Sequence, residues 1–228
     1  MKFRQLEEPA LAVCAGAIYP YSENLLAQCQ RESKYGDGFS LCRVVGAGAN
    51  RRLWLPRNMA ASTYSDLRED GMDYKFNSTF KPRNDEQKRV VAESISLLSQ
   101  GVNFMLESPT GSGKTIMAID LIAQVGKKTL VVVIKEDIRD QWVDAIETIL
   151  GLTSGKGIGF IQGDTCNITN AGVVIAFVQS IAKEQRYPDY IFKEFGLCIW
   201  DEIHHIGADV FSQSCFRVPA KLDRKSVV

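Results

Sequence analysis

The sequence has little of what secreted and membrane proteins need. Its six cysteines show no paired spacing across 228 residues, which excludes a disulfide framework and indicates reduced thiols. The apolar stretch from Leu11 to Ile18 is too short to span a membrane, and it lacks the basic run-up and cleavage site of a signal peptide. We therefore expect a cytoplasmic protein without membrane contact.

Histidine and an excess of one charge are also missing. The two histidines, His204 and His205, are adjacent, so their side chains diverge, and no nearby cysteine suggests a zinc site. With 27 basic and 27 acidic residues the formal net charge is zero, and the isoelectric point is near 6.7. Such a protein does not hold nucleic acid by overall attraction, so any contacts should be local and salt-sensitive.

The first segment that carries chemistry is SPTGSGKT, from Ser108 to Thr115. Apolar residues precede it and a helical pattern begins at Lys114, so the segment predicts a strand, a tight turn and a helix. Glycines let several backbone N–H groups point at one anion, and the helix N-terminus adds partial positive charge. We expect Lys114 to reach the β- and γ-phosphates of a nucleotide and Thr115 to ligate Mg²⁺. The expected nucleotide-binding residues are Pro109, Thr110, Gly111, Ser112, Gly113, Lys114 and Thr115.

One position departs from the G-x-x-x-x-G-K-[ST] pattern, because Ser108 replaces its first glycine. A small residue still permits the turn. The alternative interpretation is a glycine-containing loop that binds nothing, and the flanking strand and helix patterns argue against it.

The second segment is IWDEIHH, from Ile199 to His205. A buried strand that ends in two carboxylates places charge where a core cannot keep it, so these groups favour a cation. We expect Asp201 to belong to the Mg²⁺ sphere and Glu202 to polarise the attacking water, with Lys114 completing the catalytic set. The alternative is an ordinary polar strand end at the surface.

Several segments together carry a family resemblance. SPTGSGKT, KTLVVVIKEDIRDQW, IAFVQSI and WDEIHHIGADVFS resemble motifs I, Ia, Ic and II of superfamily 2 helicases and translocases. The acidic motif is similar to the DEAD/DEAH group, and the segments together resemble those of phage DNA helicases of the UvsW and transcription-repair type. The resemblance covers about Phe80 to Ala220. It implies an ATP- and Mg²⁺-dependent enzyme acting on DNA, located in the host cytoplasm if phage-encoded.

The resemblance also assigns residues outside the two main motifs. FKPRNDEQKRVV resembles the adenine-reading segment, with Gln87 placed to hydrogen-bond the base; the alternative is a solvated residue in a helix capped by Asn84 or Asp85. Lys135 and Arg139 lie where the family contacts the nucleic-acid backbone. Gln179 and Ser180 follow an apolar run at a strand exit, where uncharged polar groups suit phosphate oxygens. Trp142 lies on an amphipathic helical spacing and is expected in the core.

The order of apolar runs predicts an α/β fold. Runs at about Asn103–Leu106, Thr129–Ile134, Ile158–Ile161, Val173–Val178 and Leu197–Trp200 alternate with helical patterns, which indicates a central parallel sheet covered on both faces. We expect a RecA-like P-loop NTPase lobe over residues 76–228 and a small α+β accessory domain over residues 1–75. In the latter, Arg43, Arg51, Arg52 and Arg57 surround Trp54 without any acid. They predict either a nucleic-acid contact or merely solvated arginines.

The end of the sequence limits the expected activity. VPAKLDRKSVV stands where the family has a Ser-Ala-Thr coupling motif, and the family's second RecA-like lobe is missing from this sequence. We expect a lobe truncated before or at that motif, with weak ATP binding and slow turnover. A duplex translocase of restriction or remodelling type and a non-catalytic nucleic-acid-binding module remain as alternatives to a DNA helicase.

Overall fold

The computed structural model describes residues 9–13, 16–32, 38–56, 65–183, 186–202 and 213–227. His204, His205 and Arg57 lie outside these residues. The chain forms two compact units, Met1–Arg68 and Glu69–Val228. Residues 69–75, which we expected in the accessory domain, therefore belong to the second unit. Among the described residues, no helix is long and apolar enough to cross a membrane.

The described part of the first unit contains a five-stranded sheet, a two-stranded sheet and helix α1. Its strands, in the order β5-β6-β2-β1-β7, are Arg43–Val45, Arg52–Pro56, Gly16–Pro20, Ala10–Val13 and Ser65–Asp66. Helix α1 spans Glu23–Gln28, the 3₁₀ turn η1 spans Gly48–Asn50, and β3 (Gln30–Glu32) pairs with β4 (Gly38–Ser40). Leu53 and Leu55 point inward from β6 and pack with Leu25 and Leu26 of α1, which gives this unit its own core.

The second unit is built on an eight-stranded sheet. The order along it is β10-β11-β13-β9-β14-β15-β8, and β12 pairs with β11. These strands are Thr153–Ser154, Gly157–Gln162, Val173–Phe177, Thr129–Val133, Leu197–Trp200, Leu222–Val227 and Phe104–Glu107, with β12 at Thr165–Cys166. Every pairing is parallel except that of β12. The sheet places the carboxyl ends of its parallel strands along one edge.

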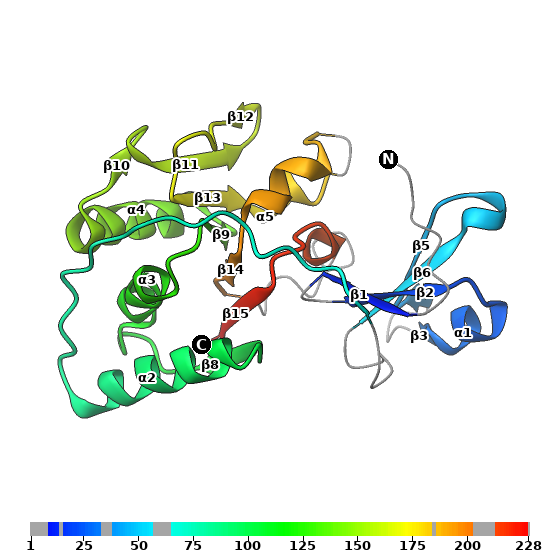
Figure 1. Cartoon of the computed structure of the whole chain (residues 1–228), viewed down its shortest axis with the longest axis horizontal. Coiled ribbons are helices and arrows are strands. Elements are labelled where there is room, and N and C mark those ends of the chain that lie inside the picture. The colour runs from blue at the N-terminus through cyan, green and yellow to red at the C-terminus, as the bar shows by residue number, and fades with distance from the viewer. Residues whose placement is uncertain are drawn as a thin grey trace. The chain divides into compact units, whose positions relative to one another are not determined.

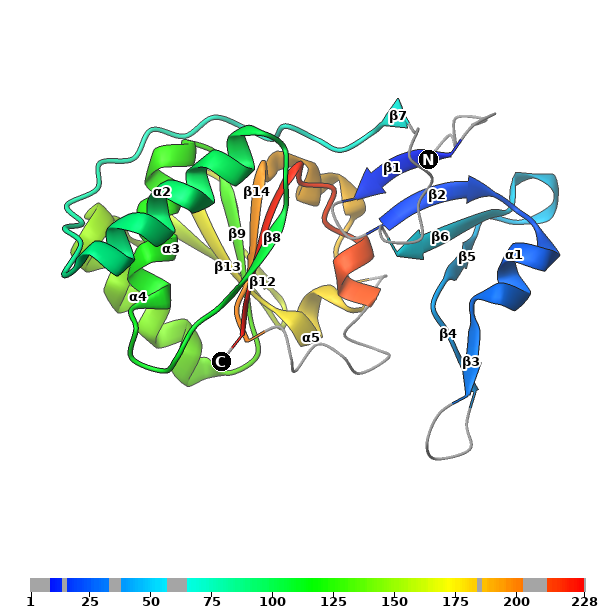
Figure 2. The same cartoon turned by 90° about the horizontal axis from the view of Figure 1, so that it is seen from below.

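Helices cover both faces of this sheet, as Figure 1 and Figure 2 show. On one face lie α2 (Asp85–Ser99), α3 (Lys114–Val125) and α4 (Glu136–Leu150). The other face is covered by α5 (Val178–Ile181) and the 3₁₀ segment η3 (Asp189–Glu194), with η5 at Gln213–Phe216. Strands β9, β13 and β14 are buried along their whole length, which explains their continuous apolar sequences. The predicted α/β fold and its five strands are confirmed.

Strand β15 is a central element of the sheet that the sequence did not predict. It runs between β14 and β8, and Asp223 and Arg224 on it are only 0% and 2% exposed. A central strand normally reads as an apolar run, and LDRKSV does not. Its place in the sheet comes from its neighbours, because pairing on both sides satisfies its backbone.

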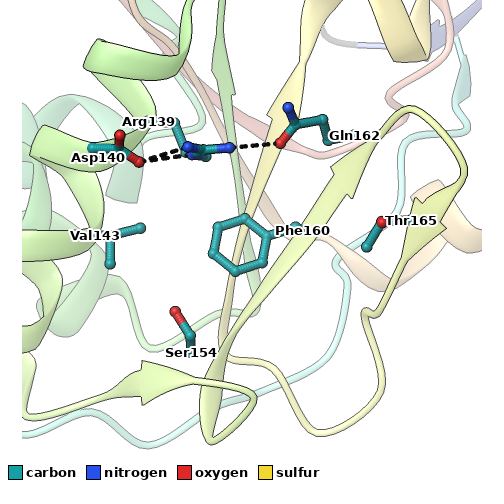
Figure 3. A pocket seen from close by; sticks show the side chains of 7 residues that line it. All are labelled: Arg139, Asp140, Val143, Ser154, Phe160, Gln162 and Thr165. Carbon is teal, nitrogen blue, oxygen red and sulfur yellow. Dashed lines mark hydrogen bonds and ion pairs between the residues drawn. The ribbon is translucent and has the colours of Figure 1, made fainter.

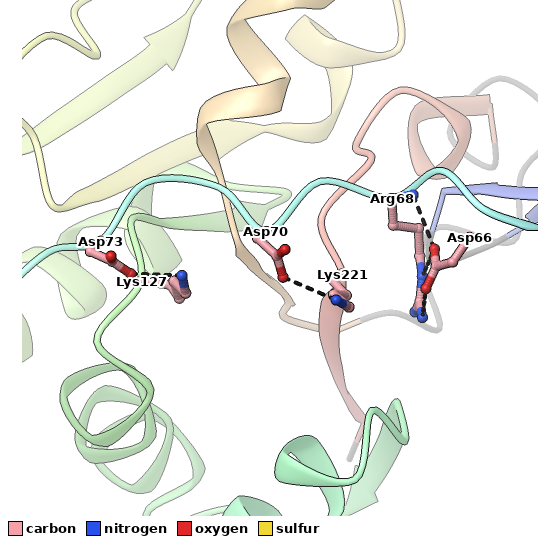
Figure 4. A network of polar contacts seen from close by, with 6 residues as sticks. All are labelled: Asp66, Arg68, Asp70, Asp73, Lys127 and Lys221. Carbon is pink, nitrogen blue, oxygen red and sulfur yellow. Dashed lines mark hydrogen bonds and ion pairs between the residues drawn. The ribbon is translucent and has the colours of Figure 1, made fainter.

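A strap of extended chain, residues 69–80, crosses the amino-terminal ends of the strands. The Met72 N–H donates to Glu194 O, the Lys128 N–H donates to Met72 O, and the Tyr74 N–H donates to Gly126 O. Two ion pairs add to the strap, Asp70 with Lys221 at 3.1 Å and Asp73 with Lys127 at 2.6 Å (Figure 4). The strap and the carboxyl ends of the strands lie at opposite edges of the sheet (Figure 2).

The close approach of the strap to Gly196 gives a stability prediction. A Cβ atom at Gly196 would lie 2.1 Å from the Asp70 carbonyl oxygen. Gly196→Ala is therefore expected to destabilise the fold by about 2–3 kcal/mol, as overpacking against backbone does, and urea unfolding measures this. Gly155→Ala is the control, since nothing lies within 4 Å and only its φ of +75° opposes a side chain. Equal losses in the two variants would contradict the prediction.

Candidate functional site

The loop between β8 and α3 has the backbone geometry of a phosphate cradle. Gly111 and Gly113 adopt φ angles of 77° and 90°, in the left-handed region that favours glycine. Gly113 is the N-cap of α3, and a Cβ atom there would lie 2.7 Å from the Gln87 side-chain nitrogen. Helix α3 has no acidic residue in its first turn, so its positive end is not neutralised from within. The backbone conformation therefore favours glycine at position 113, and any side chain there would displace the Gln87 amide.

Side chains also hold this loop in shape. The Ser108 hydroxyl donates to the Ser112 hydroxyl at 2.7 Å, so a hydrogen bond links two positions of the loop that are four residues apart. Lys114 donates from Nζ to the Ser108 carbonyl at 2.8 Å. The serine that replaces the first glycine of the pattern thus contributes a hydrogen bond that glycine could not make.

Gln87 is part of the wall of this loop. It is 2% exposed, and its Nε2 donates to the Ser112 carbonyl at 2.9 Å while its Oε1 accepts the Arg83 N–H at 2.9 Å. Asn84 caps α2 by accepting the Gln87 N–H. The alternative of a solvated Gln87 is therefore wrong, although the predicted cap at Asn84 is present. The role of Gln87 toward adenine stays a prediction.

The acidic pair stands at the carboxyl end of β14. Asp201 is 8% exposed, and its Oδ2 accepts a hydrogen bond from the Trp142 indole at 2.8 Å. Glu202 is half-buried and has a φ of 52°, a left-handed value that is uncommon for a residue with a side chain. Such local strain costs about 1–3 kcal/mol and is concentrated at functional sites. Asp201 is not an ordinary surface strand end, because a surface carboxylate would be exposed.

The phosphate loop and the acidic pair share one edge of the sheet. Strands β8 and β14 are both parallel to β15, which lies between them. Arg224 of β15 connects the two: its Nη2 lies 3.5 Å from the Lys114 carbonyl oxygen. Burial lowers the pKa of Arg224 to about 10, and the negative charge of Asp201 opposes that shift. Arg224 is thus a buried cation that interacts with both motifs.

The donor set at this edge fits Mg²⁺. The Thr115 hydroxyl and the Asp201 carboxylate are hard oxygen ligands, and Mg²⁺ is commonly held by one or two such groups together with waters and substrate phosphates. Within the ranges that the structure describes, no cluster of three or more His, Cys, Asp or Glu side chains could hold a metal ion.

The predicted nucleic-acid residues lie along the same edge, beyond β14. Lys135 and Gln179 are exposed where the neighbouring strands β9 and β13 end, and Gln179 donates to the Ile134 carbonyl at 3.0 Å. Arg139, one turn into α4, donates to the Gln162 side chain at 2.8 Å and pairs with Asp140. Ser180 differs from the others: it is 6% exposed and accepts the Gly163 N–H, so it holds a loop.

A pocket of about 370 Å³ adjoins Arg139 (Figure 3). It lies between α4 and the β10–β12 region, with Val143 and Phe160 facing each other across it. Its remaining lining residues are Arg139, Asp140, Ser154, Gln162 and Thr165. The ion pair with Asp140 and the bond to Gln162 hold the Arg139 guanidinium at the pocket wall.

In the first unit, the predicted arginines contact aromatic rings. The Arg51 guanidinium lies 3.9 Å from the Tyr21 ring centroid, and that of Arg43 lies 6.0 Å from the Trp54 centroid. Arg52 donates to the Arg51 carbonyl at 2.8 Å. The role of these arginines in nucleic-acid binding stays a prediction.

Trp142 and Arg224 are the residues near the site that sequence reasoning did not assign to it. Trp142 was expected in the core and is 1% exposed, but its N–H also bonds Asp201. The amphipathic pattern of α4 indicates burial and carries no information on where a ring nitrogen points. Arg224 falls in a segment without any strand pattern, so no sequence signal places it beside the phosphate loop.

Comparisons with known proteins agree with this geometry. Residues 80–224 match the family described as "Type III restriction enzyme, res subunit". A putative ATP-dependent RNA helicase of Acanthamoeba polyphaga mimivirus is 36% identical over 149 residues, which are 65% of this chain and 27% of that protein. A putative DNA 3′-5′ helicase of Halobacterium salinarum is 34% identical over 110 residues, 48% of this chain and 18% of that one. The chain thus spans about a quarter or less of these relatives.

A solved structure shows the same fold over nearly the whole chain. The crystal structure of the UvsW helicase from bacteriophage T4 superposes with a TM-score of 0.61 at 16% identity, covering 96% of this chain and 90% of that one. The likeness confirms the predicted RecA-like architecture. This protein belongs to the family described as "Type III restriction enzyme, res subunit", which residues 80–224 match, and its second unit has the RecA-like fold.

Proposed function

We propose that the second unit binds ATP with Mg²⁺ at the edge formed by β8, β15 and β14 and promotes its hydrolysis. The observation that carries the proposal is that β8 and β14 flank β15 in one parallel sheet, which supports one shared site for the phosphate loop and the acidic pair that follow them. Arg224 of β15 lies 3.5 Å from the Lys114 carbonyl oxygen. Lys114 and the N-terminus of α3 bind the β- and γ-phosphates. Mg²⁺ would neutralise developing charge on the phosphates, held through Thr115 and Asp201.

Glu202 acts on the attacking water in this proposal. Its carboxylate follows Asp201 directly and orients the water toward the γ-phosphate. Gln87 reads adenine, using the hydrogen-bonding capacity that its amide keeps beside the contacts to Arg83 and Ser112. The positive φ of Glu202 supports a functional position, since strain of this kind is retained where the geometry is needed.

We further propose that ATP turnover drives movement on nucleic acid, with DNA as the substrate, in a helicase or translocase. Lys135, Arg139 and Gln179 lie on the edge that also carries the nucleotide site, so a bound strand and a bound nucleotide would contact one rigid sheet. Arg51 and Arg52 of the first unit are additional contacts in this proposal. Ser180 is left out because it is buried.

Strand movement in this proposal requires a second RecA-like lobe, which would supply arginines that stabilise the charge developing on the γ-phosphate. Such arginines accelerate phosphoryl transfer about 10³- to 10⁵-fold. Turnover by this lobe alone is accordingly slow. A rate near one per second or faster for the monomeric chain would contradict this part of the proposal.

The test of the catalytic proposal is Glu202→Gln, which removes the charge and keeps the shape. Cleavage of radiolabelled ATP in single-turnover conditions is expected to slow about 100-fold, because general-base catalysis contributes about 10²–10⁴. Affinity for a fluorescent ATP analogue should change less than about threefold, since the side chain acts on water rather than on the nucleotide. Unchanged cleavage would remove Glu202 from the mechanism.

Adding different nucleic acids to the same ATP-cleavage assay separates the candidate functions. Stimulation of cleavage by forked DNA, with strand displacement by a two-lobed relative, supports a helicase. Stimulation by duplex DNA without displacement supports a translocase of restriction type, the alternative favoured by the family match. Stimulation by RNA alone rejects DNA as the substrate. DNA binding that is indifferent to ATP and to Lys114→Ala supports a non-catalytic module.

A further inference from the structure

The Asp201 carboxylate lies inside the fold, where its orientation depends on protein partners. It is only 8% exposed, and a buried carboxylate is costly unless it is hydrogen-bonded or paired with a positive charge. The indole N–H of Trp142 supplies a hydrogen bond of 2.8 Å to Oδ2. Because an indole can only donate, this contact fixes which carboxylate oxygen faces α4.

Trp142 has two separate functions in α4. Its ring is 1% exposed and packs in the core between the helix and the sheet, together with Ile146 one turn further along the same face. The ring nitrogen bonds Asp201 at the end of β14. A phenylalanine would retain most of the packing and lose the hydrogen bond, so the two functions can be separated by mutation.

Arg224 lies on β15, the strand next to β14, and Asp201 directly follows β14. It pairs in register with Ile199, two residues before Asp201, so Arg224, Ile199 and Asp201 lie on the same face of the sheet. The guanidinium is 2% exposed, and its Nη2 lies 3.5 Å from the Lys114 carbonyl oxygen in the first turn of α3. With a pKa of about 10 it stays positively charged at neutral pH, and its charge acts on Asp201 within the fold.

We propose that Trp142 and Arg224 are positioning residues that hold the Asp201 carboxylate in one orientation and tie it to the first turn of the phosphate-loop helix. The inference rests on the proposed role of Asp201 toward Mg²⁺. Fixing the carboxylate in advance avoids the entropy cost of ordering it when the metal–nucleotide complex binds. The contribution should therefore be visible in binding that depends on Mg²⁺.

Two conservative pairs of variants separate positioning from packing. Trp142→Phe removes the N–H, and Ile146→Val removes one methyl group from the same helix face without touching a polar group. Arg224→Met removes the charge from β15, and Arg224→Lys retains it. All four variants and the unmodified full chain are examined well below their melting temperatures, with folding checked by circular dichroism.

The readout is the affinity for a fluorescent ADP analogue in excess Mg²⁺ divided by the affinity in excess EDTA. We expect this ratio to fall about tenfold in Trp142→Phe and Arg224→Met, to be unchanged in Ile146→Val, and to be partly restored in Arg224→Lys. If Trp142→Phe keeps the ratio of the unmodified chain, the inference is overturned. If Arg224→Met does not fold, Trp142→Phe and Arg224→Lys decide the outcome.

A further arm separates this inference from the proposed function. Lys114→Ala should lower affinity in both Mg²⁺ and EDTA, because the lysine binds phosphate directly. If Lys114→Ala has no effect, or if the unmodified chain gains no affinity from Mg²⁺, the proposed nucleotide site itself is wrong. If Lys114→Ala weakens binding while Trp142→Phe matches Ile146→Val, only the positioning inference fails.

Discussion

Lys114→Ala is expected to weaken the binding of an ATP analogue about 30- to 100-fold. The lysine would form charge-assisted hydrogen bonds to the β- and γ-phosphates, and bonds to charged groups contribute about 1.5–3 kcal/mol each. In this structure Nζ already lies on the loop, bonded to the Ser108 carbonyl, so little rearrangement separates that contact from a phosphate oxygen. Titration of a fluorescent ATP analogue measures the loss.

A second lysine provides the matched control. Lys88 lies exposed on α2, and Lys88→Ala removes the same charge from a solvated surface. The Lys88→Ala change should alter nucleotide affinity less than about twofold, because water and salt screen the charge of a solvent-exposed lysine. Similar affinities for Lys114→Ala and the unmodified chain would refute the phosphate-binding role of the loop.

Arg217→Met is expected to cause a large loss of stability, about 3–5 kcal/mol. The guanidinium is 6% exposed and donates to the carbonyl oxygens of Ile181, Lys183 and Tyr187 and to the Asp189 carboxylate. Methionine fills similar space but leaves the three carbonyl oxygens and the Asp189 carboxylate without this donor, and each buried group deprived of its partner costs about 1–3 kcal/mol. The melting temperature should fall by roughly 10 °C, as calorimetry would record.

Arg89→Met is the control for this change. Arg89 is exposed on α2, where it pairs with Glu86 and Glu93 on the helix surface. Exposed pairs of this kind contribute little, so the melting temperature should hardly move. A loss in Arg217→Met no greater than that in Arg89→Met would show that the loop after α5 is held by other contacts.

The fold was predictable where burial leaves a pattern in the sequence. Strands such as β9 and β13 are covered on both faces and therefore appear as unbroken apolar runs. The strap at residues 69–80 and strand β15 have no such pattern. Both are held mainly by backbone hydrogen bonds, which any residue except proline can donate, so composition carries little information about them.

The site was predictable where its residues are contiguous. A phosphate loop draws its backbone N–H groups from one short segment, and the glycine pattern records that requirement. The contacts of Trp142 with Asp201 and of Arg224 with Lys114 join residues 59 and 110 positions apart. Such pairs depend on how strands are ordered in the sheet, and a single sequence does not specify that order.

The strap also bears on how a fragment of this protein should be cut. The family match begins at residue 80, which suggests that position as a domain boundary. A polypeptide that begins at residue 80 would lack the backbone hydrogen-bond partners of Gly126, Lys128 and Glu194. The amino-terminal ends of the strands would then be exposed to water. A polypeptide that begins at Glu69 keeps these strand ends covered. Soluble expression should therefore depend on the eleven residues 69–79, which carry no recognisable motif.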